Sequence, residues 1–139
     1  SDGNMIKAYA NIQNDNDANE FFDFFVTLMR LAYQRKIKDL REWSSDLTAL
    51  GRERELSFYE YAIRLIRENF IFNFNTPDLN YMNRKETGFS TNFARFITER
   101  NVEKLIEVFD KARIDIAGNA NGKVVNLDVA IKVILLLKS

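Results

Sequence analysis

The sequence predicts an all-α fold, a compact bundle of about five to six helices. Three observations support this fold class. Apolar residues recur at intervals of three and four along most of the chain. The 139 residues include only one proline and five glycines, so helix breakers are rare. Hydrophobic residues make up 46% of the chain, and its length is that of one ordinary domain. We therefore expect residues 17–139 to form a single helical domain.

The N-terminal segment, residues 1–16, is expected to be a flexible lead-in or a cloning remnant. It is polar and ends in a run of Asn and Asp from Asn14 to Asp17, which favours a helix cap there. A first helix then follows from about Glu20. Its apolar stripe is broad enough to imply contacts on two sides, and its main positions are Phe21, Phe25, Leu28, Met29 and Ala32.

Two further amphipathic helices are predicted next. In the second helix, apolar residues stand three or four apart from Ile37 to Leu50, and Gly51 supplies the expected stop. In the third helix, apolar positions repeat with a 3,4,3,4 rhythm from Leu56 to Phe70. One face of this long helix must therefore be buried.

The last three helices are predicted partly from their caps. Asn83 and Glu86 have the spacing of a capping box for a short fourth helix. Asn101 is the expected cap of a fifth helix, which ends near Gly118. The sixth helix, from about residue 125 to residue 137, is apolar on nearly all sides. Such a helix is expected to be central, or to be covered by a neighbour.

Composition argues against catalysis by this chain. It contains no cysteine and no histidine, which removes the commonest general base and metal ligand. Neither glycine-rich phosphate-binding motif is present. We therefore expect no catalytic residue, no cofactor, no metal site and no small-molecule substrate. The lack of cysteine favours a cytoplasmic location, and no apolar stretch reaches the ~20 residues of a membrane span.

Acidic and basic residues are balanced at 20 each, so a charged partner must be met by a local patch. One such patch is possible on the third predicted helix. There, arginines alternate with aromatic residues in the set Arg52, Arg54, Phe58, Tyr59, Tyr61, Arg64 and Arg67. This set could neutralise and stack on single-stranded nucleic acid. The favoured interpretation is a solvated helix with ion pairs such as Glu60 with Arg64, one turn apart. Nucleic-acid binding is kept as the alternative function.

The same region resembles a known family, the delta prime subunits of the bacterial DNA polymerase III clamp loader, and most closely the Bacteroidetes type. The similar residues are Gly51, Arg52, Glu53, Phe58, Tyr59, Tyr61 and the run Arg67 to Phe70. In the second half of the chain they are Glu99 to Val102, Asn119 to Asn121, Leu127 and Leu135 to Leu137. The resemblance covers most of residues 21–137 and is to the C-terminal, or collar, domain.

The resemblance implies a role in DNA replication. The collar domain would hold its subunit in the five-membered complex that loads the sliding clamp on primed DNA. Its partners would be the delta and tau/gamma subunits, with DNA met only indirectly through the full complex. Asn101 and Asn121 carry over as helix caps. Asn126 departs from the family pattern, because an apolar or aromatic residue is expected there.

The candidate residues for subunit interfaces or packing combine these observations. They are Arg52, Tyr59, Tyr61, Arg64, Arg67, Phe70, Asn101, Asn121 and Leu135. None of them forms a catalytic signature.

Overall fold

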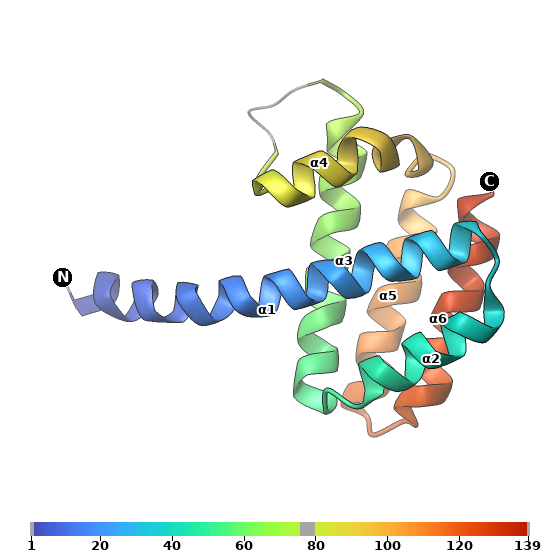
Figure 1. Ribbon diagram of the computed structural model, residues 1–139, viewed down its shortest axis with the longest axis horizontal. Helices are drawn as coiled ribbons and strands as arrows, with labels where there is room; N and C mark the ends of the chain where they lie inside the picture. The colour runs from blue at the N-terminus through green and yellow to red at the C-terminus, as the bar shows by residue number, and fades with distance from the viewer. Residues whose placement is uncertain (1, 76–79, 139) are drawn as a thin grey trace.

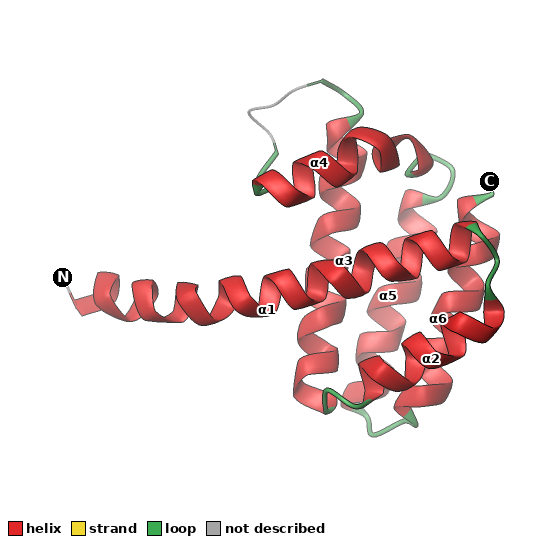
Figure 2. Cartoon of the chain, in the orientation of Figure 1, coloured by secondary structure: helices red, strands yellow, loops and turns green. Residues whose placement is uncertain are grey.

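The computed structural model describes residues 2–75 and 80–138, with side chains described from Asp17 onward. This part of the chain is a helical bundle without strands, which confirms the predicted all-α fold (Figure 2). The elements are α1 (Asp2–Tyr33), α2 (Ile37–Thr48), α3 (Arg52–Phe72), α4 (Arg84–Phe93), the 3₁₀ helix η2 (Ala94–Phe96), α5 (Val102–Ala117) and α6 (Gly122–Leu137). None of the described helices contains an apolar stretch long enough for a membrane span.

The helices are arranged in two layers. In Figure 1, α3, α5 and α6 run side by side, and α1 crosses in front of them. Helix α2 folds back from the end of α1 and packs on α6, while α4 lies across one end of α3. Helix α1 therefore contacts both α3 and α6 and spans the width of the bundle.

Aromatic side chains join the two layers. The ring of Phe58 on α3 is fully buried and lies 6.1 Å from the rings of Phe21, Phe24 and Trp43, and 5.3 Å from that of Tyr59. All four pairs are edge-to-face, a geometry worth about 0.5–1.5 kcal/mol per pair beyond area burial. The core is therefore centred where α1 and α2 meet α3.

Helix α1 is longer than the sequence suggested. It begins at Asp2, so the helix includes the backbone of residues 2–16, and it projects beyond the bundle (Figure 1). The expected cap at the Asn and Asp run near Asp17 is therefore wrong. Once a helix has started, each added residue gains a hydrogen bond while only its own backbone is fixed. A polar run with intermediate helix propensity can therefore continue the helix.

The far end of α1 is closed by a Schellman motif. Arg35 adopts a left-handed conformation with φ of 57°, and its N–H donates to the carbonyl of Ala32 at 3.1 Å. The N–H of Lys36 donates to the carbonyl of Leu31 at 3.0 Å. Glycine is the usual residue at such a position, because a Cβ disfavours positive φ. This turn directs α2 back across the bundle.

Two of the predicted helix caps are confirmed. The side chain of Asn83 accepts from the N–H of Glu86 at 2.8 Å, and the Glu86 carboxylate accepts from the N–H of Asn83 at 3.0 Å. This is a complete capping box. At α6, the Asn121 side chain accepts from the N–H of Val124 at 3.3 Å. Each cap satisfies a backbone donor that the first turn leaves free.

Asn101 is the residue immediately before α5, but its side chain does not cap the helix. Its fully buried side chain accepts from the N–H of Thr98 at 2.9 Å. Its amide donates to the carbonyls of Phe96 and Leu136, at 2.8 and 3.0 Å. The helical backbone conformation of Asn101 leaves its side chain free to bridge to the end of α6. The predicted cap is therefore wrong, and the residue instead ties α6 to the loop before α5.

Candidate functional site

A buried polar cluster lies between α2, α3 and α6. Asn126 is fully buried, and its side-chain oxygen accepts a hydrogen bond from the Tyr59 hydroxyl. Its side-chain amide donates to the Glu55 carboxylate at 2.9 Å and to the Thr48 hydroxyl at 3.0 Å. The apolar residue expected at this position is thus replaced by a partnered amide. The backbone of Gly122 fits closely here, since a Cβ on it would lie 2.8 Å from the Glu55 carboxylate.

Burial sets the titration of this cluster. It raises the pKa of the Glu55 carboxyl, and the hydrogen bond from Asn126 opposes that rise. The pKa of the Tyr59 hydroxyl is raised well above its usual value by burial, and further by the nearby Glu55 charge. Each group has a partner inside the fold, so the cluster functions in packing between three helices.

A second cluster anchors α4 to α3. The buried Glu86 carboxylate accepts from the Tyr61 hydroxyl at 2.5 Å and pairs with the Arg64 guanidinium at 2.7 Å. Arg64 also donates to the carbonyl of Tyr81 at 2.9 Å. Burial raises the pKa of Tyr61, and its hydrogen bond to Glu86 adds to the rise. The expected Glu60 pair is not formed, because Arg64 points to the N-terminus of α4 instead.

The remaining predicted residues of α3 lie apart from one another. Arg52 donates to the side chain of Asn119, and Arg54 pairs with Asp17 and Glu20, each at 2.9 Å. Arg67 is exposed and lies with the half-buried Phe70 beside a shallow hollow over α5. The predicted candidates therefore do not form one surface.

The aromatic residues predicted to stack on nucleic acid are not available for stacking. Phe58 and Tyr59 are fully buried, and Tyr61 is buried against Glu86. Three of the four arginines of this set, Arg52, Arg54 and Arg64, are engaged by side chains of the same chain. Base stacking needs open ring faces, so this helix does not present the predicted binding face.

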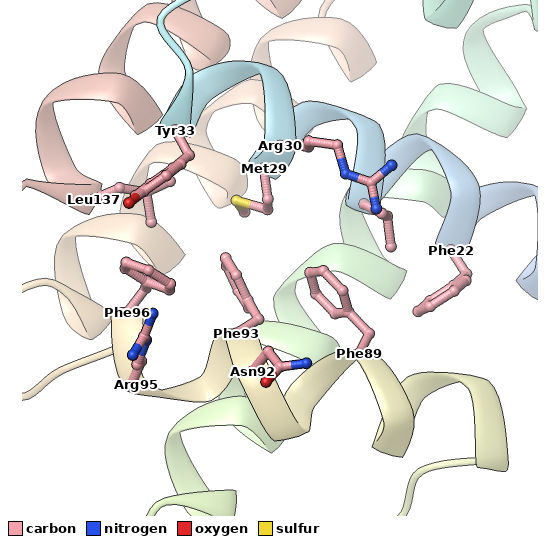
Figure 3. Close-up of a pocket in the computed structure, with 11 residues that line it drawn as sticks. Phe22, Met29, Arg30, Tyr33, Phe89, Asn92, Phe93, Arg95, Phe96 and Leu137 are labelled. Carbon is pink, nitrogen blue, oxygen red and sulfur yellow. The ribbon is translucent and has the colours of Figure 1, made fainter.

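An apolar groove of about 550 Å³ lies between α1 and α4. We call it the aromatic groove. Figure 3 shows its two walls facing each other across open space. It is lined by Phe22, Val26, Met29, Arg30 and Tyr33 from α1; Phe89, Asn92 and Phe93 from α4; Arg95 and Phe96 from η2; and Leu137 from α6.

Helical spacing on both walls produces this groove. Phe22, Val26, Met29 and Tyr33 stand four, three and four residues apart, so they form one stripe along α1. On α4, Phe89 stacks against the next turn, with its ring 4.7 Å from that of Phe93. Phe89 also makes an edge-to-face contact with Phe22 at 5.9 Å at one end of the groove, and Tyr33 makes one with Phe96 at 5.3 Å at the other, so the two walls meet at both ends.

Sequence reasoning did not identify this groove as a site. The available signal was the breadth of the apolar stripe on the first helix, which implied contacts on two sides. One side of α1 packs on α3, and the other faces the groove. Which side would stay open could not be judged before α4 was placed.

A second apolar surface runs along the outside of α6. We call it the α6 stripe, formed by Val124, Ile131 and Leu135, which are 65%, 40% and 61% exposed. Their spacing of seven and four residues places them on one line of the helix. The exposed Asp128, which pairs with Lys132 at 2.8 Å, lies on the same line between Val124 and Ile131. At 100° per residue, Leu135 lies 200° from Val133, which is fully buried. The stripe thus faces away from the core, and the predicted interface residue Leu135 is part of it.

No group of three or more acidic side chains in the described residues is placed to hold a metal ion. Comparison of the chain with protein-family models, with curated proteins and with solved structures finds no match. The candidate site is therefore defined by geometry: an aromatic groove on one side of the bundle and an apolar stripe on the outer face of α6.

Proposed function

We propose that this chain is the oligomerisation, or collar, domain of a clamp-loader subunit of delta prime type, which holds its subunit in the pentameric complex that loads the sliding clamp. The observation that carries the proposal is the α6 stripe, three exposed apolar side chains on one side of a helix whose other side forms the core. The proposed assembly is taken from the sequence resemblance. A domain in the collar of that assembly needs a surface that contacts its neighbours.

The geometry of the stripe is that of a helix that packs on another helix. Single exposed apolar side chains are normal on any protein. Val124, Ile131 and Leu135, however, repeat at the spacing with which helices pack along a common seam. Burying them against a neighbour removes apolar surface from water, the main driving force of association. A neighbouring subunit is therefore the natural cover.

A member of a ring has two neighbours and needs two different surfaces. The α6 stripe and the aromatic groove meet this requirement, because Leu135 and Leu137 point 200° apart on α6. The interior also suits a rigid spacer. Among the described residues, only the Asn69 side-chain oxygen is buried without a hydrogen-bond partner. A collar of such domains would keep attached modules in fixed positions.

The proposed partners are the delta and tau/gamma subunits, in the cytoplasm, with DNA contacted only through the complete loader. The test is to co-purify this chain with the helical domains of those subunits and to measure the mass of the complex by light scattering. We expect a stable complex, and the double variant Ile131→Glu with Leu135→Glu should weaken it at least about tenfold, because charges then occupy the seam.

The control is Ile37→Glu, which places a single glutamate on an apolar side chain of α2 that is 48% exposed. It should leave the complex intact. Failure of every subunit combination to associate would remove the collar proposal. If the complex forms but is equally tight with the double variant and with the control, the α6 stripe is not an interface. The isolated chain should also show no binding to primed DNA in fluorescence anisotropy.

A further inference from the structure

We infer that the aromatic groove binds an amphipathic helix of a partner protein, with apolar side chains inserted between α1 and α4 and carboxylates along its flanks. The inference deepens the proposed function. It rests on that function only where it identifies the partner as another loader subunit. Its three supports are the shape of the groove, the chemistry of its floor and the sign of the charge around it.

The shape fits one helix. The groove lies between two helices and follows the α1 stripe from Phe22 to Tyr33, eleven residues at 1.5 Å rise, which is about 16 Å. That length corresponds to about three turns of an occupant. The floor is formed by rings from both walls, and Met29 adds an adaptable thioether. Grooves of this kind take helices that insert side chains at positions i, i+3, i+4 and i+7.

The charge around the groove selects an acidic occupant. Its lining contains Arg30 and Arg95 and no acidic residue. Neither arginine forms an ion pair within the described structure; the Arg95 guanidinium lies 5.0 Å over the Phe96 ring. At the ends of α1 and α6 a neighbouring hollow adds Arg35 and Lys138, again without an acidic residue.

The opposite side of α1 has the reverse charge. The hollow between α1 and α2 is lined by five acidic residues: Glu20, Asp23, Asp39, Glu42 and Asp46. The chain as a whole has no net charge, so its charges are separated by face. A partner helix with carboxylates is thus attracted to the groove and repelled from the other side of α1, which fixes where it docks.

The test uses the whole chain and two synthetic probes in fluorescence anisotropy. Both probes are labelled helical peptides of about 18 residues, five turns, with leucines at i, i+3, i+4 and i+7. One carries glutamates on its flanks and the other carries lysines at the same positions. We expect the glutamate peptide to bind at least about tenfold more tightly, with an affinity that falls as salt rises.

Charge reversal gives the decisive comparison. The double variant Arg30→Glu with Arg95→Glu should invert the preference, so that the lysine peptide binds more tightly. The control Arg41→Glu with Arg100→Glu changes the net charge equally at exposed positions outside the groove lining, and should leave the preference unchanged. Equal binding of both peptides, no binding of either, or no effect of the Arg30 and Arg95 reversal would overturn the inference.

The two proposals fail separately. If the glutamate peptide binds but no loader subunit associates, the collar function falls and the groove assignment stands. If the loader subunits associate but the peptides do not bind, the collar function stands and the groove is not a helix site. Dimerisation of the chain in analytical ultracentrifugation that is lost in the Arg30 and Arg95 variant would show that a second copy fills the groove, which overturns the partner assignment.

Discussion

Asn126 makes the strongest test of how the bundle is held together, because one side chain connects three helices. It is fully buried and bridges Tyr59 and Glu55 on α3 to Thr48 at the end of α2. The variant Asn126→Ala removes these bonds without adding bulk. The Thr48 hydroxyl keeps a bond to the carbonyl of Ser44 at 2.8 Å. The Tyr59 hydroxyl and the Glu55 carboxylate lose the partner that faces them.

The expected loss follows from those two groups. Each buried polar group left without a partner costs about 1–3 kcal/mol, and a charged group lies at the upper end. Alanine is the better helix former by roughly 0.6 kcal/mol, which offsets part of the cost. We expect Asn126→Ala to lower the free energy of unfolding by about 3–4 kcal/mol. A domain of ordinary stability, about 5–15 kcal/mol, remains folded after that loss.

The loss should also depend on pH, through Glu55. Burial raises the pKa of this carboxyl above its ordinary value of 4.5, and the Asn126 amide opposes the rise. Between the unfolded and folded pKa values the native state holds more protons, so the free energy of unfolding falls as pH rises through that window. Removing the amide raises the folded pKa further. The loss in Asn126→Ala should therefore be larger near pH 7 than near pH 5.

Urea denaturation followed by Trp43 fluorescence measures these values, since Trp43 is the chain's single tryptophan and is buried. The matched control is Asn69→Ala, another fully buried asparagine, whose amide bonds only to the carbonyl of Leu65 in its own helix at 2.8 Å. Its loss should be about 1 kcal/mol or less. Equal losses in the two variants, or a loss in Asn126→Ala that does not change with pH, would refute the reasoning.

Three further stability predictions follow from backbone and ion-pair geometry, each measured by urea denaturation. Gly122→Ala should destabilise the fold by about 1–3 kcal/mol, because its Cβ would meet the Glu55 carboxylate. Gly88→Ala should stabilise the fold by about 0.5–1 kcal/mol, because nothing lies within 4 Å of its added Cβ. A stability change of the same sign in both variants would contradict the close approach at Gly122. Arg35→Gly should stabilise by about 0.5–1 kcal/mol, since φ is 57° there, and a loss would show that its side chain matters more than strain. Glu86→Gln should destabilise by about 1–2 kcal/mol, because the buried Glu86 loses its charge beside Arg64, whose side chain is 42% exposed, and an unchanged midpoint would rule that out.

The helices were predictable from sequence because each buries one face against the bundle. The inner positions of the 3,4,3,4 rhythm of α3, Tyr59, Ile63 and Ile66, are buried, and its end positions are half-buried. The capping box of Asn83 and Glu86 forms as predicted. The start of α1 was missed, because polar residues typical of a cap are also tolerated inside a helix that continues through them. Local chemistry thus predicted the elements more securely than their ends.

The polar contacts between helices were not predictable, because they join residues far apart in the chain. Asn126 and Tyr59 are 67 residues apart, and Asn101 reaches a carbonyl 35 residues away. Sequence patterns assign an asparagine to a cap or a turn, where its partner is a few residues distant. A buried asparagine with distant partners has the same local sequence signature. The roles of both residues therefore depended on the packing of α6.

Helix α6 shows that its sequence alone does not determine which of its faces is buried in the bundle. Its composition is apolar on nearly all sides, which is typical of a helix covered all round. In the bundle, Ala130 and Val133 are fully buried, while Ile131 and Leu135 remain exposed. The sequence could not distinguish cover by the same chain from cover by another. Because the described bundle leaves Ile131 and Leu135 exposed, we propose that a partner covers them, and the Ile131 and Leu135 variants test that proposal directly.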